Sequence, residues 1–429
     1  PVVDAKAYDN IAQNIVAGYG FVENAGADVK FDAAIIRVGP LYQFFLAGIY
    51  AVFGHHYEAV WLIQAFLHAL SALFVYLSAR ILFKNNVNKP RDITRDPDFT
   101  SGEKISLVSA AIIGFFPDLI EISAMVMTET LYIFLWTLFL WYFLKFADEK
   151  IDEQKNKYFH AILLGLVSGL AVLARPPVLF VLPVMFLYFI LKKNLAVLVV
   201  LLLSIGAVFI PWTIRNYQAY NKIMPFGGAG GYNFWIGNHV GATGEQDKPD
   251  EVVLFTEKYG TYLLSDESIR QFKIFVKNNP MEFTRLTLSR INHYFSFARP
   301  MGFWFYDSGL SQLVFVLSSV LASMFLFIFA LFGIIKNWAN QNNLQKYWLG
   351  FFVATPLILF ITVVETRYRF QVYPLLAVFA AYGAVEFWQN KSLWKSRAFV
   401  FSALFIFLNA ILDLSLSMDK LKEKLSLFF

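Results

Sequence analysis

The sequence predicts an all-α, polytopic membrane protein, because the chain is apolar, poor in charge and divided into repeated long apolar segments. Of its 429 residues, 58% are hydrophobic and only 16% are charged. Soluble domains contain about 45–50% apolar and about 25% charged residues. A helix that spans a bilayer needs about 20 mainly apolar residues, and segments near this length recur along the chain.

The apolar segments give the order of the chain. Ten transmembrane helices are expected, at 58–83, 104–119, 129–146, 158–174, 177–191, 195–214, 310–335, 347–364, 370–389 and 398–417. They divide the chain into a first loop (1–57), six spans (58–216), a long loop (217–309), four spans (310–417) and a short tail (418–429). Because an external first loop needs a span before it, we expect one further helix upstream.

The first loop is predicted to hold two short helices. Asp4 and Tyr8 are one helical turn apart, and an apolar stripe continues from Tyr8 at helical spacing. Gly18 then ends this helix, and a second apolar segment closes at Gly54. Both helices are too short to cross a bilayer, so they suit a membrane surface.

The positions of the lysines and arginines predict which side each loop occupies. Short basic loops all fall on one side of the span count, and by the positive-inside rule that side is cytoplasmic. Their basic residues are Lys84, Lys89, Arg91, Arg95, Lys150, Lys155, Lys157, Lys192, Lys193, Lys336, Lys346, Lys391, Lys395 and Arg397. The first loop, the long loop and the turns around 117–128, 175 and 365–369 are therefore expected outside.

Composition excludes some chemistry. The chain has no cysteine, so it has neither disulfides nor thiolate metal sites. Its net charge of +5 is small for this length and indicates membrane topology, not nucleic-acid binding.

Ionisable residues gather at the external ends of the spans. They are Asp118, Glu121, Glu129, Arg175, Arg215, Glu365, Arg367 and Arg369, and Asp4 and Arg37 of the first loop can join them. Ion-coupled carriers place such residues near the membrane midplane, whereas an enzyme with a lipid-borne substrate needs them at this depth. The alternative is that they anchor the interface or snorkel.

Several of these residues suit catalysis. Asp4 is the candidate general base for an acceptor hydroxyl, although an aspartate here also suits a helix N-cap. Glu129 can orient the acceptor or the base, or can simply favour the start of its helix. Arg37 is a phosphate ligand or an interfacial anchor. Arg215 suits the forked binding of phosphate oxygens, and Arg367 with Arg369 forms a second candidate phosphate clamp.

The long loop is predicted to be a folded, amphipathic cap. The run 227–238 is rich in glycine but lacks the ending of a P-loop, so its glycines indicate tight turns or a close approach to a ligand. Ser265 is expected to cap one helix, and Pro280 to start the next.

Taken in order, eight short pieces of the sequence resemble one family. They are Asp4-x-x-x-Tyr8, residues 37–42 before Phe53-Gly54, Thr128-Glu129, Arg175-Pro176-Pro177, Pro211-Trp212 with Arg215-Asn216-Tyr217, residues 231–238, Asn279-Pro280, and Arg367-Tyr368-Arg369 before Pro374. The chain is similar to membrane glycosyltransferases of the GT-C fold. Within that fold it resembles the bacterial, family 39-like branch that is related to protein O-mannosyltransferases and to the aminoarabinose transferase that modifies lipid A.

This resemblance implies a core of at least eleven helices, a catalytic aspartate at the start of the first external loop, and a polyprenyl-phosphate sugar as donor. The chain departs from the pattern at Ala5, where many relatives have glutamate, and this weakens an acidic-pair metal site. No cofactor is required, and a divalent metal stays an open alternative. Expected catalytic residues are Asp4 and Glu129, and expected substrate-binding residues are Arg37, Tyr42, Arg175, Arg215, Asn216, Arg367 and Arg369.

The expected activity is transfer of the sugar to a hydroxyl of a lipid, glycan or protein, at the extracytoplasmic face of a bacterial-type inner membrane. A single displacement with one base inverts the anomeric configuration. The alternatives are a transporter or flippase of lipid-linked substrates, a polymerase or ligase with a different pocket, and a membrane scaffold.

Overall fold

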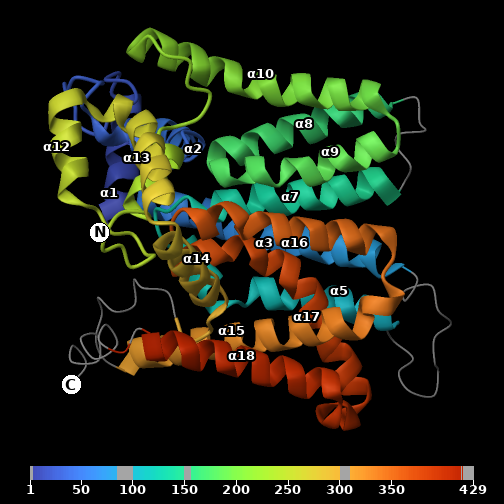
Figure 1. Cartoon of the computed structure of the whole chain (residues 1–429). Coiled ribbons are helices and arrows are strands. Elements are labelled where there is room, and N and C mark those ends of the chain that lie inside the picture. Colours follow the sequence, from blue (N-terminus) through green and yellow to red (C-terminus); the bar gives the residue numbers. More distant parts are fainter. Residues whose placement is uncertain (1–2, 85–99, 149–155, 300–309, 417, 419–429) are drawn as a thin grey trace.

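A computed structural model describes residues 3–84, 100–148, 156–299, 310–416 and 418 (Figure 1). Every regular element within these ranges is a helix, which confirms the all-α fold class. Part of the predicted basic loops, including Lys89, Arg91, Arg95, Lys150 and Lys155, lies outside the described residues, as does nearly all of the tail.

Eight described helices are long and apolar enough to cross a membrane. They are α3 (Tyr57–Leu82), α7 (Glu129–Asp148), α8 (Lys157–Ala174), α10 (Leu195–Tyr220), α15 (Leu310–Asn337), α16 (Asn343–Ile361), α17 (Tyr373–Gln389) and α18 (Arg397–Leu416). They form one bundle with α10 and α18 on opposite sides, and each overlaps a predicted span (Figure 1).

The other two predicted spans have a different form. The segment at 104–119 is a bent pair, α5 (Ser101–Gly114) and α6 (Pro117–Ser123), which meet at 52°. Phe116 precedes a proline and is extended, with ψ 119°, because the proline ring excludes helical backbone before it. If this pair is one span, the described residues hold nine candidate spans, which is close to the ten expected.

The predicted span at 177–191 is also shorter than expected. Pro176 and Pro177 lie in a 3-10 turn, η3 (Pro176–Phe180), which leads into α9 (Leu182–Leu191) of only 10 residues. Neighbouring prolines lack two backbone N–H groups, so they favour a tight turn over a continuous helix. A helix of 10 residues is about half of what a crossing needs.

The first loop holds the two predicted short helices, α1 (Val3–Val16) and α2 (Leu41–Phe53), with a 3-10 turn, η1 (Ala33–Ile36), between them. The long loop forms the predicted cap: α11 (Ala229–Ile236), α12 (Asp250–Tyr259), α13 (Leu264–Asn278) and α14 (Pro280–Phe295), with η4 (Thr261–Leu263) before α13. α1, α12 and α13 lie together at one end of the bundle (Figure 1).

Backbone contacts fasten the cap to the first loop. Gly228 donates its N–H to the carbonyl of Ile35 at 2.7 Å, and the Thr261 hydroxyl donates to the carbonyl of Asp32 at 2.6 Å. The cap therefore packs on the loop that carries Asp4.

Two details of the cap differ from expectation. Much of the glycine run is the helix α11, and a side chain at Gly237 would collide with the carbonyl of Thr362, so this glycine permits close packing of protein on protein. Ser265 is not an N-cap, because α13 begins at Leu264 and the chain is already helical through η4.

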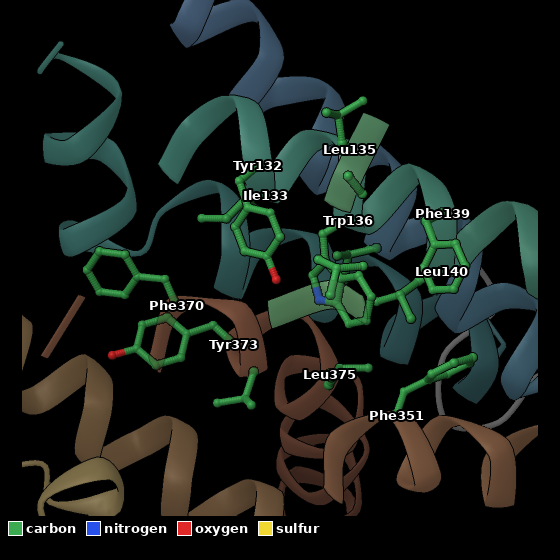
Figure 2. Close-up of a cluster of buried hydrophobic side chains, with 14 of the residues drawn as sticks. Tyr132, Ile133, Leu135, Trp136, Phe139, Leu140, Phe351, Phe370, Tyr373 and Leu375 are labelled. Carbon is green, nitrogen blue, oxygen red and sulfur yellow. The ribbon is translucent and has the colours of Figure 1, made fainter. Parts of the chain in front are cut away.

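A cluster of buried hydrophobic side chains, many of them aromatic, includes Phe370 of the turn η7 (Thr366–Val372) (Figure 2). Trp136 of α7 donates its indole N–H to the carbonyl of Gln371 at 2.9 Å, and Tyr132 donates to the Gln371 side chain at 3.2 Å. Figure 2 shows these rings beside Phe370 and Tyr373. This packing fixes the turn that carries Arg367.

Candidate active site

Asp4 lies where the first and last thirds of the chain meet. It sits in the first turn of α1, and its Oδ2 is 2.7 Å from Nη2 of Arg367, a residue 363 positions away. Its Oδ1 is 3.5 Å from Nη1 of Arg37. The carboxylate thus binds two of the arginines that the sequence predicts for the site, and 26% of its side chain stays exposed.

Arg367 is shared among several acids. Its Nε donates to Oε2 of Glu365 at 2.8 Å and lies 3.9 Å from Oε1 of Glu129. Only 10% of its side chain is exposed. This guanidinium therefore joins Asp4 to Glu129.

Glu129 and Arg175 form the innermost pair. Glu129 begins α7 with 1% of its side chain exposed, and it accepts hydrogen bonds from Arg175 and from Thr128. Arg175 ends α8 with an extended backbone, and its guanidinium lies 5.7 Å from the Tyr132 ring and 5.6 Å from the Tyr368 ring. Stacking on aromatic faces adds to the ion pair in holding this cation.

Arg37 continues the series beyond Asp4. Its Nε and Nη2 donate to both carboxylate oxygens of Glu23, at 2.9–3.0 Å. The result is one connected chain of ion pairs, which we call the ion-pair chain. Its members are Glu23, Arg37, Asp4, Arg367, Glu365, Glu129 and Arg175.

The ion-pair chain has an open and a closed end. Four carboxylates against three guanidiniums give it a net formal charge of −1. Glu365 and Asp4 are 27% and 26% exposed, whereas Glu129 is 1% exposed. A polar substrate can therefore reach Asp4 more readily than it can reach Glu129.

Two tyrosines border the ion-pair chain, and the sequence analysis named neither as a site residue. Tyr8 is 2% exposed, and burial together with the charge of Asp4 raises the pKa of its phenol, which therefore stays protonated at neutral pH. Burial also raises the pKa of Tyr232 in α11, while nearby Arg37 lowers it. The spacing of Asp4 and Tyr8 pointed to the first, whereas only the folded cap brings Tyr232 here.

Tyr42 lies behind Tyr8. Their rings meet edge to face with centroids 5.6 Å apart, and the Tyr42 hydroxyl donates to Gln64 at 2.9 Å. Tyr42 is fully buried, so in this structure it supports Tyr8.

The remaining predicted substrate-binding residues have partners outside the ion-pair chain. Arg215 donates to the carbonyl of Phe21 at 3.0 Å and to the hydroxyl of Tyr220 at 3.2 Å, and it also bonds Asn216. Asn216 is buried and donates to the carbonyl of Met224 at 2.8 Å. These bonds fasten the end of α10 to the first loop and the start of the cap.

Arg369 faces away from Arg367. Its guanidinium donates to the carbonyls of Ser296 at 2.5 Å and Arg299 at 2.6 Å, and the residue is 1% exposed. The two arginines of the predicted clamp thus have separate partners.

Metal ligands show no obvious cluster. Among the described residues, no group of three histidine, aspartate or glutamate side chains is arranged to hold a metal ion.

Comparison with known proteins gives one family match. Residues 99–214, which include Glu129 and Arg175, match the family described as dolichyl-phosphate-mannose-protein mannosyltransferase. No curated protein matches the chain significantly. Among solved structures, the crystal structure of ArnT from Cupriavidus metallidurans in the apo state is 12% identical, with a TM-score of 0.36, over 91% of this chain and 74% of that one.

Proposed function

We propose that this chain, a membrane glycosyltransferase of the GT-C type, moves a sugar from a polyprenyl-phosphate donor to a hydroxyl acceptor on the extracytoplasmic side. The observation that carries the proposal is the contact of 2.7 Å between Asp4 and Arg367. It puts a partly exposed carboxylate, able to act as a base, beside a cation that can bind phosphate. Tail binding within the bundle would bring the donor phosphate to this depth.

The arginines would hold the donor phosphate. Arg367 and Arg37 both reach Asp4, and a guanidinium can bind two phosphate oxygens at once. Charge develops on the phosphate oxygen as the sugar leaves, and cations already in position stabilise that charge. Arg369 binds backbone carbonyls, and Arg215 binds one carbonyl and the side chains of Tyr220 and Asn216, so we assign both a supporting part.

Asp4 would act as the base. It removes the proton from the acceptor hydroxyl, whose oxygen forms a bond to the anomeric carbon. The bond from that carbon to the phosphate oxygen breaks, and its electron pair leaves with the polyprenyl phosphate. One displacement gives a product of inverted configuration. Glu129, closed off from solvent, would orient Arg367 and Arg175.

The test is sugar transfer from a polyprenyl-phosphate donor by purified Asp4→Asn and Arg367→Ala proteins. We expect each to lose about 10²–10³-fold in rate, the usual effect of removing a base or a charge-stabilising donor. Glu282→Gln is the matched control, because Glu282 pairs with Arg285 on the cap, outside the ion-pair chain. Near-normal transfer by both variants would end the proposal.

A further inference from the structure

All three arginines of the ion-pair chain are bound by carboxylates of the protein itself. Arg37 binds Glu23 and Asp4, Arg367 binds Asp4 and Glu365, and Arg175 binds Glu129. We propose that donor binding is an exchange: the donor phosphate displaces these carboxylates from Arg367 and Arg37, and this step releases Asp4 to act as the base. The inference rests on the proposed function and concerns the regulation of the same site.

The geometry makes the phosphate a competitor. On Arg37, Nε and Nη2 donate to Glu23 while Nη1 faces Asp4, so each of its three nitrogens has a carboxylate partner. On Arg367, Nη2 donates to Asp4 and Nε to Glu365. Carboxylate and phosphate oxygens bind the guanidinium fork in the same way. The donor phosphate therefore gains the favourable forked contact only where a carboxylate gives up its place.

Charge favours the same exchange. The ion-pair chain is already at −1, so an added phosphate is repelled while every carboxylate keeps its position. Exposure indicates which acids can move: Asp4 and Glu365 are about a quarter exposed and Glu23 is 18% exposed, whereas Glu129 is 1% exposed. The exchange would take place at the open end, and the pair of Glu129 with Arg175 would stay intact.

The exchange sets an order of binding. While Arg37 and Arg367 bind its oxygens, the Asp4 carboxylate is held by the two guanidiniums and cannot turn toward an acceptor hydroxyl. Once the phosphate has taken those guanidiniums, Asp4 can turn to the acceptor. The donor therefore binds first and the acceptor second.

The test is equilibrium binding of a polyprenyl monophosphate, without sugar, to the full chain in nanodiscs. If the carboxylates compete with phosphate, Glu23→Gln and Asp4→Asn should each bind this lipid about fivefold more tightly, a change close to 1 kcal/mol. Asp4→Asn should at the same time lose transfer, so that binding and activity change in opposite directions. Glu282→Gln removes an equal charge from the cap and should bind like the unchanged chain.

The outcomes separate the two proposals. Equal or weaker lipid binding by Glu23→Gln and Asp4→Asn, in a chain that binds and transfers normally when unchanged, would overturn the exchange and leave the proposed function standing. Absence of both lipid binding and transfer in the unchanged chain would overturn the proposed function as well. If Asp4→Asn fails to fold, as judged by thermal unfolding, Glu23→Gln alone decides.

Discussion

Two groups of arginines at the same end of the bundle differ in their partners. Arg37, Arg175 and Arg367 bind carboxylates, whereas Arg215 and Arg369 donate to backbone carbonyls and, for Arg215, also to the uncharged side chains of Asn216 and Tyr220. A carboxylate side chain can rotate away and leave its arginine to a substrate, but a carbonyl is fixed in the backbone. The first group, which we call the exchangeable group, can therefore exchange partners with a ligand. The second group holds segments of the chain together.

Arg367 and Arg369 show this contrast within one turn. They lie two residues apart in η7, and the sequence predicted them as one clamp. In the structure the first reaches α1 and the second reaches the end of α14 and the residues after it. Arg369 would then keep η7 in the position from which Arg367 meets Asp4.

The largest expected difference in stability and in sugar transfer is between variants at Arg369 and at Arg367. Arg369→Ala leaves two carbonyls and a buried volume without the guanidinium, and should lower the free energy of unfolding by about 2–4 kcal/mol. Arg367→Ala should instead lose transfer with a smaller loss of stability. Thermal unfolding in detergent, measured beside transfer, checks both. If Arg369→Ala folds as stably as the unchanged chain yet cannot bind donor, Arg369 belongs to the exchangeable group.

Much of the fold followed from hydropathy. Lipid requires long apolar helices whose backbone groups are bonded internally, so the composition and length of apolar segments predict where the spans lie. The exceptions are local: Pro117 bends the second span, and Pro176 with Pro177 shortens another. A window of average hydropathy does not register a single proline, so the bend in one predicted span and the short helix of the other were not predicted.

The site could be predicted only in part. Charges at the predicted external ends of the spans indicated that Asp4, Glu129 and Arg367 would meet, since residues on one side of a membrane share a surface. Side-chain direction, however, depends on packing, and the sequence held no sign that Arg369 would turn to Ser296. Nor could it pair Arg37 with Glu23, because no periodic pattern links two residues of an irregular loop.

A smaller loss of stability than for Arg369→Ala is expected when Arg215 is replaced by alanine. Its guanidinium lies between the rings of Phe21, Trp212 and Tyr220, at 5.2–5.4 Å, and bonds the carbonyl of Phe21. Arg215→Ala should lower the free energy of unfolding by about 1–2 kcal/mol, since the hydrogen bonds and ring contacts of a partly exposed guanidinium are lost. The affinity for donor should stay within about twofold, a change of at most about 0.4 kcal/mol. Matched titrations of a polyprenyl phosphate check this, and a tenfold loss of affinity would move Arg215 into the exchangeable group.

The smallest expected effect on stability is that of surface ion pairs of the cap. Their arginines belong to neither of the two groups compared above. Hydrogen bonds from Arg270 and Arg285 lower the pKa values of Glu267 and Glu282 below the ordinary value of 4.5. Because these folded-state pKa values are depressed, the pairs stabilise the cap fully above the unfolded pKa, and this contribution is lost as the pH falls through the folded-state values. We expect a slight decrease in unfolding temperature on going from pH 6 to pH 3.5, and a smaller decrease in the Glu267→Gln, Glu282→Gln double variant. Exposed pairs contribute little, because solvent and salt screen them. A decrease of the same size in the double variant would show that these two cap pairs do not cause the acid sensitivity of the fold.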